Sequence, residues 1–246
     1  MKIALIADPH ANREALEAVL EHAAEQRCER HVLLGDFVGY GADPLWVVQR
    51  AQELVRAGAV AVKGNHDDAV CGKVSPHMIE AARRAIEWTR AQLTPVHIEF
   101  LRALPMQVAD GEQLYVHANA HAPERWEYIL GRGEAQRSWR ATDARYVFCG
   151  HVHEPRLFTL QGEHCLDFVP SADMPVPVPA HRRWLVLPGS CGQPRDGNPA
   201  ACYASFDTGQ RTLTYHRVPY DHGSAAAKVA AVGLPSSFAK RLADGE

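Results

Sequence analysis

The sequence has no long apolar run, no strong charge imbalance and no closely spaced pair of cysteines. No stretch approaches the roughly 18 apolar residues of a membrane-spanning helix, and the apolar run at 3–7 is too short for the core of a signal peptide. The six cysteines include no CxxC pair, which favours reduced thiols over a disulfide framework. We therefore expect a cytoplasmic protein with no membrane partner.

The net charge and the missing motifs exclude further classes of protein. The formal net charge is −3, from 26 basic and 29 acidic residues, whereas a nucleic-acid-binding protein usually carries a strongly basic domain or stripe, so a nucleic-acid partner is not favoured. The absence of a GxSxG nucleophile elbow argues against a Ser-His-Asp hydrolase. A chain with five Trp and no low-complexity tract is not disordered.

Histidine, by contrast, is abundant. There are 14 histidines, against 7 Tyr, 7 Phe and 5 Trp. Imidazole titrates near neutrality and is the commonest metal ligand in proteins, so the surplus points to metal chemistry, although surface histidines are also common.

The pattern of apolar residues predicts an α/β chain. Apolar runs at 3–7, 31–34 and 59–62 are typical of buried strands, and Asn12 precedes a stretch with the apolar spacing of a capped helix. Repeated strand–helix–strand units of this kind imply a parallel sheet with helices on its faces. Further helices are predicted at 78–93, 95–103 and 124–142, and further strands at 106–109, 113–117, 145–149, 156–160, 164–169, 184–187, 202–206 and 211–217.

The end of the chain has a different character. Residues 170–179 hold four prolines and are predicted to form an irregular loop. Residues 223–246 are predicted to form two short amphipathic helices that cover a sheet face or edge. No linker or internal repeat is visible, so we expect residues 1–246 to be a single domain with two sheets.

Polar side chains follow five consecutive predicted strands. An aspartate or a lone histidine at such a position usually caps a helix, makes a turn or forms a structural hydrogen bond. Those explanations do not account for the whole ordered set, and ligand sites of open α/β sheets lie outside the carboxyl ends of the strands. The five segments are Asp8-Pro9-His10, Gly35-Asp36, Gly64-Asn65-His66-Asp67, Val116-His117 and Gly150-His151-Val152-His153.

The residue types in this set indicate a metal site. Asp, His and Asn side chains without cysteine suit Mn²⁺, Fe or Zn²⁺ better than a thiolate structural site. The seven candidate ligands are too many for one tetrahedral ion. They suit two ions that share a bridging carboxylate, the arrangement used to cleave phosphate esters.

In these segments the chain resembles the calcineurin-like metallophosphoesterase superfamily, whose signature is DxH, GDxx, GNH(D/E), a lone His and GHxH in that order. The resemblance covers residues 1 to about 155. Pro188-Gly189-Ser190 and Gly39-Tyr40-Gly41 are similar to features of the small bacterial and archaeal branch. The resemblance implies an αββα four-layer sandwich of two mixed β-sheets flanked by helices.

The resemblance also implies two divalent metal ions, with manganese as the first expectation and iron, zinc or nickel as alternatives. The implied mechanism is in-line attack on phosphorus by a metal-bound hydroxide. One ion would be held by Asp8, His10, Asp36 and His153, and the second by Asp36, Asn65, His117 and His151.

Three further residues receive roles from the same resemblance. His66 would protonate the leaving oxygen or stabilise its charge, and Asp67 would orient His66 by accepting its other N–H. Asn12 is a candidate for helping to hold a phosphate oxygen through the free N–H groups of the following helix.

The chain departs from the family pattern at two positions, where Ala11 and Ala118 replace frequent glycines and each adds a methyl group near the expected pocket. His121 is a competing ligand candidate, but we prefer His117 because it directly ends a strand.

We therefore predict a metal-dependent phosphoesterase that hydrolyses a small-molecule or nucleotide phosphodiester or phosphomonoester. The alternatives are a Ser/Thr protein phosphatase, a nuclease, and a non-catalytic protein-interaction scaffold on the same fold. The scaffold is disfavoured because all the candidate ligands and His66 are present.

Overall fold

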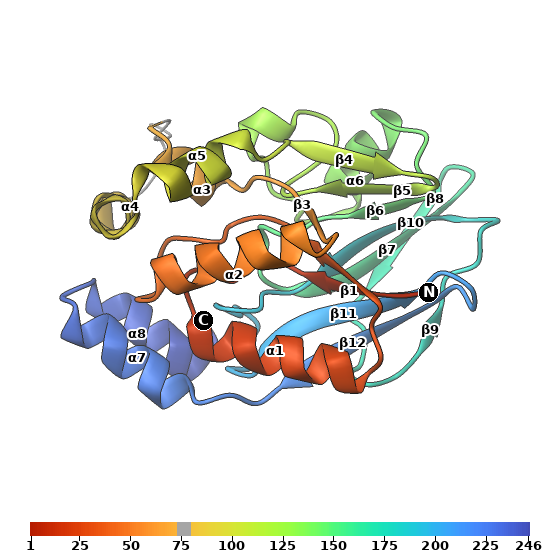
Figure 1. Cartoon of the computed structure of the whole chain (residues 1–246). Helices are drawn as coiled ribbons and strands as arrows, with labels where there is room; N and C mark the ends of the chain where they lie inside the picture. The colour runs from red at the N-terminus through yellow and green to blue at the C-terminus, as the bar shows by residue number, and fades with distance from the viewer. Residues whose placement is uncertain (73–79) are drawn as a thin grey trace.

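The structure is a computed structural model that describes residues 1–72 and 80–246 (Figure 1). Its helices are α1 (Arg13–Glu25), α2 (Pro44–Arg56), α3 (Asn65–Val70), α4 (Glu80–Gln92), α5 (Pro95–Ala103), the 3₁₀ helix η1 (Pro123–Arg125), α6 (Arg132–Arg140), α7 (His222–Ala231) and α8 (Ser236–Asp244). Its strands are β1 (Lys2–Ile6), β2 (Arg30–Leu33), β3 (Val60–Ala61), β4 (Gln107–Asp110), β5 (Gln113–Val116), β6 (Tyr146–Phe148), β7 (Pro155–Gln161), β8 (His164–Phe168), β9 (Val176–Pro177), β10 (Arg183–Pro188), β11 (Ala201–Asp207) and β12 (Thr212–Val218). The predicted strands are confirmed to within one residue at each end.

The strands form two mixed six-stranded sheets. The first has the order β3-β2-β1-β11-β12-β9 and the second has the order β4-β5-β6-β10-β7-β8. The pairs β1–β2, β2–β3, β5–β6 and β6–β10 are parallel, while β11 joins β1 antiparallel. The parallel strands expected from the first half of the chain therefore form only part of the first sheet, and antiparallel strands complete it.

The alternation of side chains along the strands builds four layers. In β1, Ile3 and Leu5 pack between the two sheets, against Phe148 of β6 among others. Ala4 and Ile6 point the other way and pack with residues of α1 and α2, which cover the outer face of the first sheet (Figure 1). On the outer face of the second sheet, α6 packs its Trp139 in one buried cluster with residues of β5, β6, β7 and β10. The predicted αββα sandwich is confirmed.

Two local predictions need correction, and a third lies partly outside the described residues. The expected helix at 124–142 is interrupted between η1 and α6, because Trp126 takes a left-handed backbone conformation with φ 56° that ends η1. The expected irregular loop at 170–179 contains the two-residue strand β9, which pairs with β12. The helix expected at 78–93 is seen as α4, and residues 78 and 79 lie outside the described residues.

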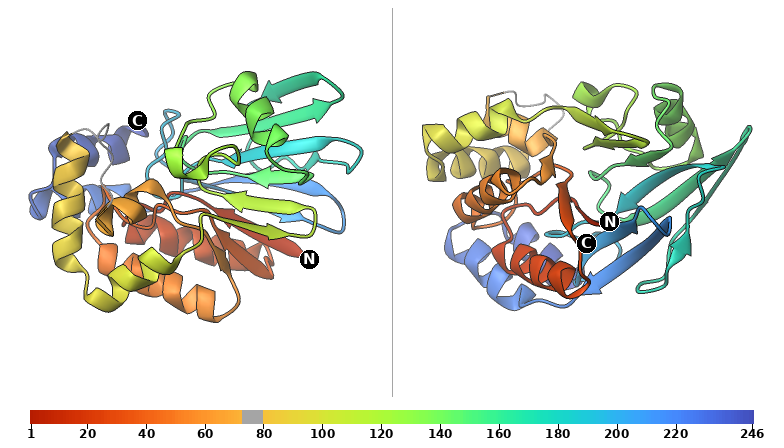
Figure 2. Two further views of the ribbon diagram at one scale, coloured as in Figure 1. Left: turned by 90° about the horizontal axis from the view of Figure 1, so that it is seen from above. Right: turned by 45° about the vertical axis from the view of Figure 1, so that its right-hand side comes forward.

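The two predicted C-terminal helices are present, but they do not lie on a sheet. Figure 2 shows α4, α7 and α8 gathered at the end of the strands opposite to the N-terminus. Phe238 of α8 and Val229 of α7 form a buried cluster with Ala85 of α4, and Tyr40 packs against this cluster. Lys228 Nζ lies 2.5 Å from Glu14 Oε1 and 2.8 Å from Asp43 Oδ2, which ties α7 to the starts of α1 and α2.

The remaining general expectations concern thiols and membranes. All six cysteines are free, as predicted. Within residues 1–72 and 80–246, no helix has the length and apolar character needed to cross a membrane.

The packing between the sheets predicts a large loss of stability for Phe148→Ala. Phe148 is fully buried, and its ring centroid lies 5.5 Å from that of Tyr115 and 5.6 Å from that of Phe206. We expect a loss of about 3–5 kcal/mol in the free energy of unfolding, measured by urea denaturation. Phe168→Ala, at a side chain that is 41% exposed on β8, serves as the control and should cost about 1 kcal/mol or less. Equal losses in the two variants would contradict this account of the core.

Candidate metal centre

The carboxyl ends of β1, β2 and β3 in the first sheet meet those of β5 and β6 in the second, and the predicted ligands gather at this junction. Within residues 1–72 and 80–246, three groups of buried side chains have ligand atoms within 4.8 Å of one another. These groups are Asp8, His10 and His153; His10, Asp36 and His66; and Asp36, His117 and His151.

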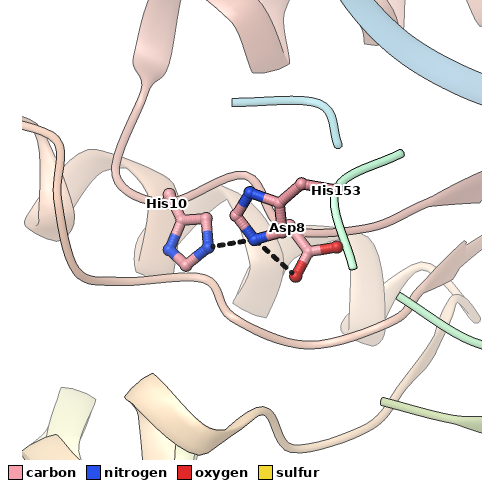
Figure 3. A group of neighbouring side chains, drawn as sticks. All are labelled: Asp8, His10 and His153. Carbon is pink, nitrogen blue, oxygen red and sulfur yellow. Dashed lines mark hydrogen bonds and ion pairs between the residues drawn. The ribbon is translucent and has the colours of Figure 1, made fainter. Parts of the chain in front are cut away.

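The first group brings together side chains from the loop after β1 and from the loop after β6 (Figure 3). His10 Nε2 lies 3.0 Å from His153 Nε2, and His153 Nε2 lies 3.4 Å from Asp8 Oδ1. The carboxylate of Asp8 also accepts a hydrogen bond from the backbone N–H of His151 at 3.0 Å. Two imidazoles and one carboxylate therefore converge on one point.

The third group, of Asp36, His117 and His151, is centred on His117. Its Nε2 atom lies 3.1 Å from Asn65 Oδ1, 3.2 Å from His151 Nδ1 and 3.4 Å from Asp36 Oδ2. Asp36 Oδ2 is also 3.6 Å from His10 Nε2 of the first group. One carboxylate oxygen therefore faces both groups.

The outer ring nitrogens of the four predicted histidine ligands all face backbone carbonyl oxygens. The pairs are His10 Nδ1 with Val38 O at 3.0 Å, His117 Nδ1 with Leu34 O at 2.7 Å, His151 Nε2 with Trp126 O at 2.9 Å, and His153 Nδ1 with Gln193 O at 2.7 Å. A carbonyl oxygen only accepts, so in each ring the outer nitrogen carries the hydrogen and the inner nitrogen of the neutral imidazole presents its lone pair.

These inward lone pairs suit a cation. Burial lowers the pKa of His10, His151 and His153, so these rings are neutral near pH 7. Burial acts in the same direction on His117, but the charge of Asp36 outweighs it and raises the pKa of His117 to about 9. Without metal this ring therefore carries a proton near pH 7, and a metal ion would have to displace that proton to reach the Nε2 lone pair. Neutral ring nitrogens 3.0 Å apart, such as those of His10 and His153, repel unless a proton or a metal ion lies between them. The donor set therefore fits metal ions.

The loops that carry these residues hold an uncommon backbone conformation. Left-handed conformations cost a residue with a side chain about 1–2 kcal/mol, and such outliers cluster at functional sites. Backbone hydrogen bonds between the β1 and β2 loops, including His10 N to Asp36 O at 2.9 Å, hold this geometry. The residues concerned, with φ between 45° and 70°, are Asp8, His10, Asp36, His151 and His153.

Asp67 does not orient His66 as predicted. Its carboxylate instead accepts hydrogen bonds from the backbone N–H groups of Asp36, Phe37 and Gly64, each at 2.9 Å. Three converging N–H donors hold a carboxylate more strongly than one imidazole does. Asp67 therefore joins the loop after β2 to the loop after β3 and fixes the backbone of Asp36.

His66 differs from the four histidines of the ligand set. Its Nδ1 atom is buried without a hydrogen-bond partner among the described residues. The ring is held by packing, with its centroid 4.5 Å from the Tyr40 ring and 4.9 Å from the His10 ring. Burial lowers the pKa of His66 to about 4, so the imidazole is neutral near pH 7.

Gly64 is required sterically beside these residues. A Cβ atom at this position would overlap Asp36 Oδ1, which accepts a hydrogen bond from the backbone N–H of His66 at 2.8 Å. The glycine before Asn65 therefore allows the loop after β3 to approach Asp36 closely.

Sequence reasoning gave no role to several residues that shape the site. Ser190 Oγ donates to the carbonyl oxygen of Asp8 at 2.9 Å, and the Pro-Gly-Ser motif was the signal that could have indicated this. Trp126 supplies a carbonyl oxygen to His151 and had no signal in the sequence. Tyr128 is 45% exposed and stacks on His151 with a centroid separation of 4.1 Å.

The four remaining predicted positions lie at the border of the site. His121 is exposed and belongs to none of the three groups. Ala11 and Ala118 are both buried. The Asn12 amide caps α1 by accepting from Ala15 N at 3.1 Å, and it donates to Gly192 O at 2.8 Å. The side chain of Asn12 is thus occupied within the fold, and its predicted help in holding phosphate stays a prediction.

Comparison with known proteins gives a consistent result. Residues 1–211 match the calcineurin-like phosphoesterase superfamily domain. The chain is 33% identical over 245 residues to the uncharacterized protein MJ0912 of Methanocaldococcus jannaschii, covering 98% of this chain and 96% of that protein. A crystal structure of a metallophosphoesterase from Sphaerobacter thermophilus is 37% identical, with a TM-score of 0.89 and coverage of 100% of this chain and 99% of that chain. The hypothetical protein PH1004 from Pyrococcus horikoshii, at 19% identity and a TM-score of 0.80 over 100% of this chain and 98% of that chain, shares the fold.

The role found for Asp67 predicts that Asp67→Asn destabilises the protein even without metal. Asparagine has one acceptor oxygen, and its NH₂ group would face N–H donors that the carboxylate now satisfies. We expect a loss of about 3 kcal/mol in the free energy of unfolding of the metal-free protein, measured by urea denaturation. The control is Asp221→Asn at the N-cap of α7, which should be nearly neutral because asparagine caps helices equally well. Unchanged stability of Asp67→Asn would contradict the assigned role.

Proposed function

Because the chain belongs to the calcineurin-like phosphoesterase superfamily, we propose that it is a dimetal-dependent phosphoesterase that hydrolyses small-molecule or nucleotide phosphate esters. The observation that carries this proposal is the sharing of Asp36 Oδ2 between two groups of inward-facing ligand atoms. A single carboxylate oxygen between two sets of nitrogen lone pairs is the donor arrangement that two ions with a bridging ligand require.

We assign the ligands as two overlapping sets. Asp8, His10, Asp36 and His153 would hold one ion, and Asp36, Asn65, His117 and His151 would hold the other. Manganese is the first candidate, and iron, zinc and nickel accept the same mixed oxygen and nitrogen donors. When bound, the two ions would lower the pKa of a water molecule and neutralise the oxygens of the phosphate under attack.

His66 is proposed to act on the leaving oxygen. Its Nδ1 atom has no partner in the described part of the chain, so this ring is not committed to a backbone carbonyl as the four ligands are. Since burial lowers its pKa to about 4, the ring holds no spare proton at neutral pH before substrate binds. Of the two roles predicted, stabilising the developing charge by a hydrogen bond from the neutral imidazole fits better than storing a proton.

We further propose that residues 1–246 act as one domain. The family match ends at residue 211, but β12 continues the first sheet through residue 218. Phe238 of α8 packs against Tyr40, next to the site, with ring centroids 5.0 Å apart. The C-terminal helices are therefore expected to unfold together with the sandwich.

The ligand assignment predicts different metal contents for two histidine variants. The wild-type protein should bind two ions per chain, and His117→Ala should lose at least one of them because three ligand atoms face its Nε2 atom. His121→Ala is the matched control, since this exposed histidine lies four residues away and outside the ligand groups. Metal analysis of protein purified from metal-supplemented medium measures both. Retention of two ions by His117→Ala would refute the assignment.

The proposed reaction predicts turnover by manganese-loaded protein of p-nitrophenyl phosphate, bis-p-nitrophenyl phosphate or both. Substitution His66→Ala should leave the metal content intact and lower kcat by roughly 10²-fold or more. His181→Ala, at an exposed histidine, provides the control. Unchanged turnover in His66→Ala would remove the role of His66. Absence of turnover in the wild type with manganese, iron, zinc and nickel would favour the non-catalytic scaffold.

A further inference from the structure

Tyr40 lies beside the candidate metal centre and is approached by a guanidinium group from outside the family motifs. Its ring centroid lies 4.6 Å from that of His10 and 4.5 Å from that of His66. The guanidinium carbon of Arg195 lies 5.9 Å from the centre of the Tyr40 ring. No hydrogen bond of the Tyr40 hydroxyl is found in the described ranges.

The guanidinium of Arg195 has no carboxylate partner within residues 1–72 and 80–246. The backbone N–H of Arg195 donates to the carbonyl oxygen of His153 at 3.2 Å, and this hydrogen bond places Arg195 next to a predicted ligand. Nη2 contacts only Gln193 Oε1 at 3.3 Å, and Nε is buried without a hydrogen-bond partner. The adjacent carboxylate of Asp196 is paired with Arg217 instead. Arg195 thus keeps unused donors at the edge of the metal centre.

A second arginine, Arg241, approaches Tyr40 from α8. Arg241 lies three residues after Phe238 and therefore on the same side of α8. The Phe238 ring packs against the Tyr40 ring, with the ring centroids 5.0 Å apart. Burial raises the pKa of Tyr40, while the charges of Arg195 and Arg241 act in the opposite direction, as nearby cations do. Among the described residues, no hydrogen bond or ion pair engages the Arg241 guanidinium.

An anion would compensate the positive charges of this region. With two divalent ions bound, Asp8 and Asp36 would leave the ligand set positively charged, and Arg195 would add a further positive charge beside it. Like charges at such distances are unfavourable unless an anionic group compensates them. A phosphate at the metal ions would face the ligand set, whereas Arg195 lies against the Tyr40 ring and is not a member of that set.

We propose that Tyr40, Arg195 and Arg241 form a subsite for a second anionic group of the substrate, a carboxylate or a phosphate, next to the phosphoester held at the metal centre. The proposal rests on the proposed phosphoesterase function and specifies its substrate class. Guanidinium groups bind both carboxylate and phosphate oxygens with paired N–H donors, and the tyrosine hydroxyl adds one further donor.

Two matched pairs of compounds test the subsite by isothermal titration calorimetry on manganese-loaded protein. 3-Phosphoglycerate carries a carboxylate where glycerol 3-phosphate carries a hydroxymethyl group. Fructose 1,6-bisphosphate carries a second phosphate that fructose 6-phosphate lacks. We expect the doubly anionic member of at least one pair to bind about 10-fold or more tightly than its partner. The pair that shows the difference identifies the second group as carboxylate or phosphate.

The variants Arg195→Gln and Arg241→Gln should each reduce this difference, while binding of the singly anionic compound changes little. Arg140→Gln, which removes the same charge from an exposed position on α6, should preserve the difference. If Arg195→Gln fails to fold, Tyr40→Phe tests the same subsite by removing only the hydroxyl donor.

Equal affinities within both pairs for the wild type would overturn the subsite, as would a difference that survives in both arginine variants. Failure of the proposed function appears separately, as absent turnover of the nitrophenyl esters, because the calorimetric comparison does not require turnover.

Discussion

The candidate site depends on one constraint, which is that atoms with free lone pairs are held facing one another in the interior of the protein. His10 Nε2 and His153 Nε2 come from opposite sheets and lie 3.0 Å apart because backbone carbonyls hold the far side of each ring. The carbonyl oxygens belong to loops after several different strands, so the two sheets must be correctly placed before the lone pairs meet. The apolar packing between the sheets therefore stabilises an arrangement that is unfavourable on its own and that a cation relieves.

The part of the site that follows strand ends could be predicted from sequence. Asp8, Asp36 and His117 stand directly after apolar runs, and the carboxyl ends of parallel strands meet at one edge. The partners of Asp67 could not be predicted, because its carboxylate binds N–H groups of Asp36 and Phe37, which lie 31 and 30 residues away in sequence. Hydrogen bonds to the backbone of a distant loop leave no pattern of residue types.

In the fold too, elements with a local sequence signal could be predicted, and features that depend on distant residues could not. Strands other than β9 were predicted to within one residue because apolar runs and turn residues are local signals. The expected helix at 124–142 fails because Trp126 and Glu127 direct their carbonyl oxygens to His151 and Asn119 instead of continuing helical hydrogen bonds. The antiparallel insertion of β11 beside β1 also has no local signal, since its register pairs Ile3 with Phe206.

That pairing has a consequence for the order of events during protein synthesis. The candidate ligand Asp8 leaves the ribosome 182 residues before Ser190, whose hydroxyl donates to its carbonyl oxygen, and β1 leaves it long before the β11 strand that flanks it. Until then β1 has an unpaired edge, which is the kind of surface on which nascent chains aggregate or recruit chaperones. The surroundings of the first group of candidate ligand atoms are therefore completed only after Ser190 and β11 have been made, so a metal ion bound there would join a site already formed and would not direct the earlier folding of β1.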